Sequence, residues 1–404
     1  MNDTMTIGQR IRTQRERAGI SRPVLAGLLG RSVEWVKAVE NGRLQAPRLS
    51  MLLRIAQALE LDDLATLTGD GHAVPVTVFA GERHAALTEV QTALTDYRLV
   101  LEDRAVSPRH LAERLRTAWR IRHSSPDHRT QLGALLPGLI RDAQHAARTA
   151  DDRREARRVL AGVYQLAGFY VAYQPAPELV WMVADRAMSE GYEADDPYVI
   201  ACSAWAMVQA LRDSGRWEEA IALARSAIDQ LDPYLKREAT PDDWRGIAGA
   251  LEAEIAYVFA RRGRYGEAWA GWERADEIAR QLGASYRHIQ TSFSMPVMTA
   301  HATTLGVELH RPGEALRSAR SVEPDQIVSL PRRSRHLIEV ARAYLQRDED
   351  TAALTMLIKS EQTAPETIRY NGYAREMLSE LSKKPPTGMR TEVRELSRKV
   401  GVRA

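Results

Sequence analysis

Four short segments repeat through the second half of the chain. They are Gly215-Arg-Trp-Glu-Glu-Ala220, Gly263-Arg-Tyr-Gly-Glu-Ala268, His310-Arg-Pro-Gly-Glu-Ala315 and a fainter Asp348-Glu-Asp-Thr-Ala-Ala353. Each follows an apolar helical stretch and opens another one, so each predicts an antiparallel helix pair with a small alanine where the two helices cross. Such a pair cannot bury its apolar face alone, and successive pairs must therefore stack on one another.

The remainder of the chain is also predicted to be helical. Strand signals are almost absent, and the β-branched run 73–79 contains a proline and is flanked by glycines, which indicates a linker over 70–82. After the linker, apolar residues recur at spacings of three and four, which predicts helices. These residues are Leu87, Val90, Leu94, Tyr97 and Leu101, followed by Leu111, Leu115 and Trp119.

The helix pairs resemble tetratricopeptide (TPR) repeats. The best match is Ala250–Gly283, which has Ala256, Gly263 and Ala268 in TPR-like order. Two departures are Glu252, where the family has an early tryptophan, and Arg280, where it has a closing proline. The resemblance implies a TPR-like α-solenoid within a helical domain over 83–382. The last stretch, 383–404, begins with Lys-Lys-Pro-Pro, and we expect it to be a frayed C-terminal tail.

Composition excludes several other classes of protein. No apolar run reaches the roughly 18 residues that a membrane helix needs, and the N-terminus has no apolar signal core, so we expect a cytoplasmic protein without membrane partners. The chain has a single cysteine, Cys202, and its ten histidines show no metalloprotease spacing. Phosphate loops and nucleophile elbows are absent as well. We therefore expect no metal, no cofactor and no catalytic residue.

The stretch Gly19-Ile-Ser-Arg-Pro-Val-Leu-Ala-Gly-Leu-Leu-Gly30 and its continuation to Arg43 predict two short helices joined by a tight turn. Ser21 and Ser32 are suited to cap the two helices, and Gly30 to end the first of them. Val36 and Val39 would face inward. An outward face with Val33, Trp35 and Ala38 is unusual for a solvated helix but suits contact with base edges and thymine methyl groups.

Charge is concentrated around this helix pair. Residues 6–54 contain ten basic and three acidic residues, a net +7, whereas the whole chain has a net charge of +3. A basic head on a mildly acidic body is typical of a module that binds a polyanion, joined to a domain with another role.

Residues 6–69 resemble the phage-repressor-like helix-turn-helix (XRE) family of DNA-binding domains. The resemblance rests on Gly8-Gln-Arg-Ile-Arg12, Gly19-Ile-Ser21, Leu25-Ala-Gly-Leu-Leu-Gly30, Glu40-Asn-Gly42, Pro47 and Ala56-Gln-Ala-Leu59. It implies an all-α chain whose N-terminal domain, 1–69, has five helices: 7–18, 22–29, 33–40, 49–59 and 62–67. It also implies a partly buried ion pair between Arg15 and Glu40.

The same resemblance implies which residues meet DNA. Arg22 occupies a phosphate-contact position, Arg43 and Arg48 flank the recognition helix, and base readout would fall on the outward face of that helix. The candidates are Arg22, Arg31, Ser32, Val33, Glu34, Trp35, Lys37, Ala38, Arg43 and Arg48.

In the solenoid, the first helix of each pair would line a concave groove. This places Trp205, Gln209, Arg212, Tyr257, Arg335 and Arg342 as candidate ligand-binding residues, although core packing or solvation also explains each of them. A repressor-like head on a TPR-like body resembles the peptide-responsive regulators of Gram-positive bacteria. Those regulators often hold peptide with asparagines, whereas this chain has only Asn2, Asn41 and Asn371. An arginine-rich groove would suit an acidic ligand.

These features predict a sequence-specific transcriptional regulator that binds double-stranded DNA as a homodimer and senses a peptide or small molecule. An alternative is an interaction scaffold that recruits another regulatory protein, with DNA binding secondary. A further alternative is a helix-turn-helix that has lost DNA binding and only docks to a protein. The operator, the effector, the dimer contact and the choice between repression and activation stay open.

Overall fold

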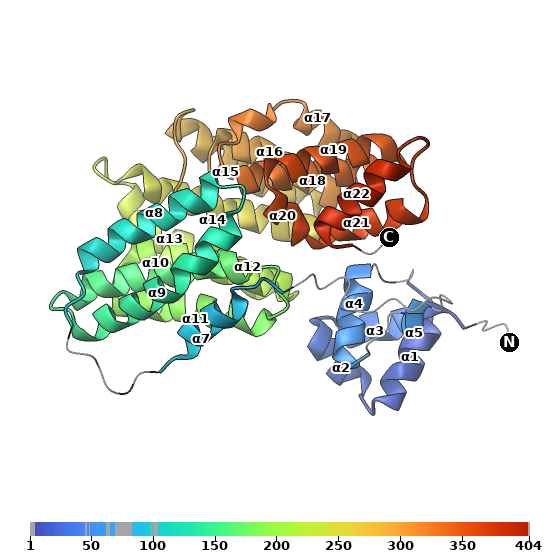
Figure 1. Ribbon diagram of the computed structural model, residues 1–404, viewed down its shortest axis with the longest axis horizontal. Helices are drawn as coiled ribbons and strands as arrows, with labels where there is room; N and C mark the ends of the chain where they lie inside the picture. Colours follow the sequence, from blue (N-terminus) through green and yellow to red (C-terminus); the bar gives the residue numbers. More distant parts are fainter. Residues whose placement is uncertain are drawn as a thin grey trace.

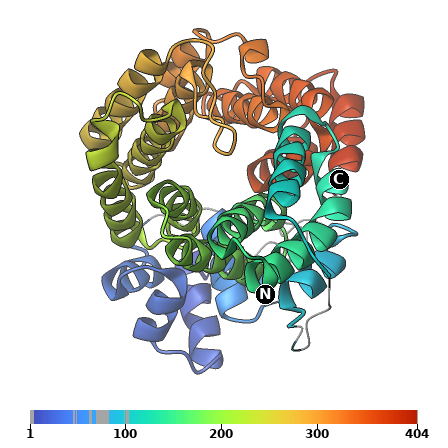
Figure 2. The same cartoon turned by 90° about the vertical axis from the view of Figure 1, so that its left-hand side faces the viewer.

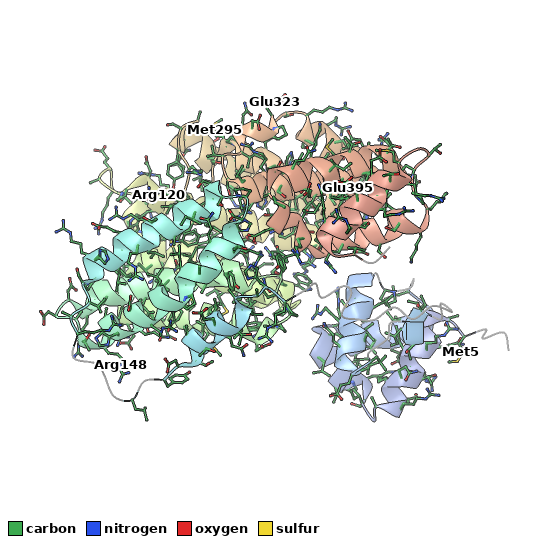
Figure 3. The ribbon with its side chains drawn as sticks, in the orientation of Figure 1. Met5, Arg120, Arg148, Met295, Glu323 and Glu395 are labelled. Atoms are coloured by element: carbon green, nitrogen blue, oxygen red, sulfur yellow. The ribbon has the colours of Figure 1, made fainter. Side chains whose placement is uncertain are left out.

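The computed structural model describes residues 5–44, 47, 49–61, 65–68, 83–97, 99 and 104–402. Every regular element in this part of the chain is a helix, which confirms the all-α prediction. The helices form a small N-terminal head and a larger body, and Figure 1 shows them as two separate units. Each unit has apolar core clusters of its own, and Figure 3 draws the side chains of both units on the ribbon. No described helix has the length and apolar character needed to cross a membrane.

The head consists of α1 (Ile7–Arg17), α2 (Arg22–Leu29), α3 (Val33–Glu40), α4 (Leu49–Ala58) and α5 (Ala65–Thr68). The limits of α2 and α3 are the predicted ones, and the predicted start of the fifth helix lies outside the described residues. Ile11, Leu25, Val36 and Ile55 form a core together with other apolar residues of the head alone. The head therefore has the core of an independent domain.

The body is a succession of antiparallel helix pairs. Within the first part of it, α8 and α9 pack on α10, and the later pairs are α12 with α13, α14 with α15, α16 with α17 and α18 with α19. The helices are α7 (Leu87–Thr95), α8 (Pro108–Ser124), α9 (His128–Thr149), α10 (Arg153–Val171), α11 (Pro177–Glu193), α12 (Pro197–Asp213), α13 (Trp217–Leu235), α14 (Asp242–Arg261), α15 (Tyr265–Leu282), α16 (Met295–Glu308), α17 (Pro312–Ala319), α18 (Leu330–Leu345), α19 (Asp350–Thr363), α20 (Pro365–Arg369), α21 (Gly372–Lys383) and α22 (Arg390–Val400), with a 3-10 turn at Pro324–Gln326.

The repeated segments mark the turns inside these pairs. Gly215, Gly263, His310 and Asp348 all have positive φ angles, from 56° to 78°. In each turn the next residue donates its backbone N–H to a carbonyl five residues earlier, for example Arg216 to Leu211 and Arg311 to Gly306. This is the left-handed stop that ends a helix and satisfies its last carbonyls. His310 and Asp348 show that the turn also accepts residues other than glycine.

The alanine of each repeated segment lies where the two helices of a pair cross. Ala220, Ala268, Ala315 and Ala353 are all fully buried. At the crossing of α14 and α15, a Cβ on Gly271 would lie 3.1 Å from the Cβ of Ala256, so the two backbones are nearly in contact. A larger side chain at these positions would push the paired helices apart.

The body closes on itself, which the sequence did not predict. Figure 2 shows its helices arranged in a ring, with the first helices beside the last. The carboxylate of Glu366 on α20 accepts hydrogen bonds from the backbone N–H groups of Arg129 (2.5 Å) and Thr130 (3.2 Å) at the start of α9. It also accepts one from the Thr130 hydroxyl at 2.5 Å. A carboxylate at a helix N-terminus satisfies free N–H groups and complements the helix dipole.

Replacing Glu366 with alanine is expected to lower the free energy of unfolding of the body by roughly 1–3 kcal/mol, because charged hydrogen bonds at a helix N-terminus are lost. Urea denaturation followed by circular dichroism would measure the change. The matched control is Glu392→Ala on α22, where the side chain is exposed and the expected change is within about 0.5 kcal/mol. Equal effects of the two substitutions would show that Glu366 does not hold the ring closed.

Two predictions about the body are wrong. The helix expected to continue through Tyr97 and Leu101 ends at Thr95, and Tyr97 is 74% exposed beside Arg186; Leu101 lies outside the described residues. The expected frayed tail instead contains α22, which is strongly amphipathic. Its buried residues Val393, Leu396 and Val400 complete the last core cluster. The predicted linker over 70–82 lies outside the described residues.

Candidate DNA-binding surface and ligand cavity

The helix-turn-helix geometry arises from local capping. The hydroxyl of Ser21 accepts from the N–H of Val24 at 3.4 Å, and that of Ser32 accepts from the N–H of Trp35 at 3.1 Å. Between the two helices, Gly30 adopts the left-handed conformation with φ 62° and ψ 41°. These features are the caps and the turn residue that the sequence predicts. They fix the angle at which α3 leaves α2.

Close packing of α1 on α3 then sets the position of the recognition helix. A Cβ on Gly8 would lie 2.1 Å from the carbonyl oxygen of Val39, so only glycine fits where α1 crosses the end of α3. Val36 and Val39 are buried beneath α3, with 2% and 4% of their surface exposed. The opposite face of α3 is thereby directed away from the core of the head.

Glu40 holds two arginines at the end of α3. Arg15 donates from Nε to Oε1 at 2.5 Å and from Nη2 to Oε2 at 3.1 Å, and Arg22 donates from Nε to Oε2 at 2.7 Å. The Glu40 side chain has no exposed surface. Its hydrogen bonds are the main cause of the raised pKa of Arg15. The expected pair of Arg15 with Glu40 is therefore a triad that joins α1, α2 and α3.

The outward face of α3 carries the expected mixture of side chains. Ser32, Val33, Glu34 and Lys37 are exposed, while Trp35 and Ala38 are half-buried. The guanidinium of Arg31 lies 5.3 Å from the centre of the Trp35 ring, and Arg43 is exposed in the following loop. Arg22 is held by Glu40 through Nε. Arg48 lies outside the described residues.

A cavity of about 330 Å³ lies inside the ring of the body. It is lined by residues of α8 to α12 on one side, and by residues of α18 and α20 together with Asn371 on the other. Its apolar wall includes Phe169, Val180, Trp181 and Trp205. A smaller cavity of about 50 Å³ lies between α12, α14, α16 and α18. The volume of the larger cavity falls at the lower end of the range of about 300–1,000 Å³ found for small-molecule pockets.

The structure brings together most of the groove residues predicted from the sequence. Trp205, Gln209 and Arg335 line the larger cavity, and Gln209, Arg212, Tyr257 and Arg335 line the smaller one. Arg342 lies outside both linings. It pairs with Glu308 at 2.8 Å and Glu339 at 2.6 Å, and its guanidinium stacks on the ring of Tyr373.

The arginines inside the ring differ in whether they are paired with carboxylates. Arg212 is paired with Glu254 and Asp213, and Asp213 also accepts from Arg261 at 3.3 Å. Asp213 is the single carboxylate in the lining of the larger cavity, which also contains Arg122, Arg129, Arg332 and Arg335. Among the described residues, none of these four arginines has a carboxylate within 4 Å of its guanidinium.

Sequence reasoning missed three of these four arginines. Arg122 belongs to α8, Arg129 to α9 and Arg332 to α18, and only closure of the ring brings them together. The Arg332-Arg-Ser-Arg335 cluster was visible in the sequence, but nothing there connected it to α8. The described residues contain no group of three or more His, Cys, Asp or Glu side chains that could hold a metal ion.

The head touches the body at the turn between α12 and α13. Arg54 of α4 donates from Nη2 to the carbonyl oxygens of Leu29 (2.9 Å) and Ser214 (3.2 Å). A Cβ on Gly30 would lie 2.5 Å from the Ser214 oxygen, and one on Gly215 would lie 3.2 Å from the Gly30 oxygen. The turn of the helix-turn-helix therefore packs backbone to backbone on a turn of the solenoid.

Comparison with protein families identifies residues 6–67 as a helix-turn-helix domain, so the chain carries such a domain at its N-terminus. A comparison with curated proteins gives no match.

Solved structures similar to this chain include PlcR from Bacillus thuringiensis in complex with the peptide PapR7 and DNA, with 13% identity, coverage of 87% of this chain and 99% of that one, and a TM-score of 0.31. A second is ComR from S. thermophilus in complex with DNA and its signalling peptide ComS, with 14% identity, coverage of 89% and 99%, and a TM-score of 0.31. A third is the apo form of the competence regulator ComR from Streptococcus vestibularis, with 15% identity, coverage of 86% and 97%, and a TM-score of 0.32.

Proposed function

We propose that this protein is a sequence-specific DNA-binding transcriptional regulator whose TPR-like body binds a peptide or small molecule and mediates dimerisation. The observation that carries the proposal is the exposed face of α3, bordered by Arg31, Lys37 and Arg43, on a head whose core is complete without it. In a helix-turn-helix such a face enters the major groove, and dimers read two half-sites. The cavity inside the ring gives the body a place to receive a signal.

A gel shift with DNA fragments from upstream of its own gene tests the proposal. These fragments should bind more tightly than random DNA of the same length at physiological salt. Equal binding would rule out sequence-specific recognition. The scaffold alternative is tested by adding culture extract: a regulator that senses a ligand changes its thermal stability and DNA affinity, whereas a scaffold changes neither.

Arg43 is expected to contribute charge and not base recognition. Arg43→Gln should weaken binding to all DNA fragments by a similar factor and reduce the slope of log K against log salt by about 1, because one phosphate contact is lost. Anisotropy titrations at several salt concentrations would measure the slope. The control is Arg17→Gln, an exposed arginine at the end of α1. A change in preference between fragments would contradict a purely electrostatic role.

The contact between head and body gives the proposed regulator a route from ligand to DNA. Asp213 and Ser214 line the larger cavity, and the carbonyl oxygen of Ser214 accepts the hydrogen bond from Arg54 of the head. Gly30 is followed directly by Arg31 and Ser32, at the end of α3 that meets base edges in a helix-turn-helix. A body packed on Gly30 restricts the space for a duplex, so a ligand that shifts the α12–α13 turn would change DNA affinity.

A further inference from the structure

We infer that the larger cavity binds an amphiphilic organic anion, with its carboxylate between Arg122, Arg332 and Arg335 and its apolar part against Phe169, Trp181 and Trp205. This inference deepens the proposed function, on which it rests for its biological meaning, by assigning the chemical class of the effector. The proposed site differs from a general peptide-binding site because it requires a negative charge at one end of the ligand.

The arginines of this cavity lack anionic partners. Arg122 has no hydrogen bond from Nε or Nη1, although both atoms are buried. Arg332 donates to the carbonyl oxygen of Thr291 at 2.9 Å, and Arg335 lies over the ring of Tyr173 at 5.6 Å. A buried guanidinium without a compensating charge is costly, and a ligand carboxylate would accept bonds from more than one of them.

The arginines of this cavity also affect one another's pKa. Burial, and then the neighbouring arginines Arg129 and Arg332, lower the pKa of Arg122 to about 9. Burial and Arg335 lower the pKa of Arg332 to about 10. Arg335 differs, because Tyr173, Tyr257 and Glu339 raise its pKa. The cationic groups of α8 and α18 thus repel one another until an anion lies between them.

The apolar wall of the cavity is aromatic. Phe169 lies 5.5 Å from Trp119 and 5.7 Å from Trp205, so the cavity has a rigid aromatic side. The Phe169 ring also lies 5.0 Å below the guanidinium of Arg122, which joins the apolar wall to the cationic one. A ligand with a flat or branched apolar part and a carboxylate at one end would contact both walls at once.

Calorimetry on the full-length protein tests the inference without DNA. The probes are 2-naphthoate and its neutral analogue 2-naphthamide, which have nearly the same shape. The acid is expected to bind at least about tenfold more tightly, and Arg122→Gln and Arg335→Gln should each remove about tenfold to a hundredfold of its affinity while leaving amide binding unchanged. Arg320→Gln, an exposed arginine after α17, is the control.

Two further measurements distinguish an anion site from a purely structural role of these arginines. The ligand-free Arg122→Gln protein should melt at the same or a higher temperature, because repulsion between the cavity arginines is relieved. A lower melting temperature together with equal loss of acid and amide binding would show a structural role and overturn the inference. A tripeptide of apolar residues is compared with its C-terminal amide. Preference for the free acid over the amide supports the carboxylate site and identifies a peptide C-terminus as one source.

Equal binding of charged and neutral forms, for both probe pairs, would overturn the inference. That result would leave the proposed function intact, because DNA affinity could still respond to culture extract. Conversely, tight binding of the acids without sequence-specific DNA binding would support the anion site and refute the proposed function as a transcriptional regulator.

Discussion

The Glu40→Ala protein is expected to lose DNA binding because its head unfolds while its body stays folded. Glu40 has no exposed side-chain surface and is bonded to both Arg15 and Arg22. Arg15 is itself almost fully buried, so removing the Glu40 carboxylate leaves a buried cation whose remaining carboxylate contact, the exposed Glu16, lies at 3.4 Å. Breaking one side of a buried ion pair typically costs about 3–5 kcal/mol. Small domains have total stabilities of about 5–15 kcal/mol, so the head has little reserve.

Differential scanning calorimetry would resolve this effect, because the core of the head is separate from the cores of the body. The transition of the head should move down by many degrees or vanish, whereas the transition of the body should not move. The matched control is Glu34→Ala, on the exposed face of the same helix, which should leave both transitions unchanged. A head that melts normally in the Glu40→Ala protein would show that the triad does not stabilise the recognition helix.

The second large effect is expected at the contact between head and body. Gly215→His should separate the two, because its Cβ would lie 3.2 Å from the Gly30 carbonyl oxygen and the ring must find space beyond it. Histidine is tolerated in this left-handed turn, since His310 occupies the equivalent place with φ 56°. Without ligand, the variant should bind its DNA site about 5- to 150-fold more tightly, the range typical of coupling between two sites.

Gly263→His is the matched control for this experiment. Gly263 has the same place in the next repeat and a φ of 73°, and a Cβ at this position would have no atom within 4 Å. The control therefore shares the backbone strain without touching the head. Fluorescence anisotropy with the same DNA fragment would compare the variants. If both variants bind DNA like the unaltered protein, the contact does not restrain the head.

Prediction from sequence was most successful for features that depend on residues close together in the chain. The caps Ser21 and Ser32, the turn at Gly30 and the buried alanines of the repeats all follow from local patterns, and the structure contains each of them. Prediction was wrong for 383–404, where Lys-Lys-Pro-Pro indicated an end to regular structure. Helix α22 forms there because Val393, Leu396 and Val400 pack on α19, α20 and α21. Such a helix owes its stability to tertiary packing, which propensity does not reveal.

The residues that line the cavity also differ in whether local sequence patterns predict them. Trp205, Gln209 and Tyr257 could be assigned to the groove because they lie on the first helix of their pairs, and the TPR-like pattern gives that helix an inner face. Arg122 and Arg129 could not be assigned, because their helices precede the repeats and carry no motif. No sequence pattern indicated the role of Glu366 either, although its hydrogen bonds to α9 join the two ends of the ring.

Local patterns in the sequence predict the helix-turn-helix head, its basic charge and the stacking of helix pairs behind it. Capping, periodicity and turn chemistry act over a few residues and can be recognised wherever they occur. Three features depend on how distant helices pack: the solenoid closes into a ring, four arginines from α8, α9 and α18 share one cavity, and Gly30 contacts Ser214. Small rotations between successive helix pairs accumulate along a solenoid, so the residues that finally meet depend on the sum of all the packing contacts between them.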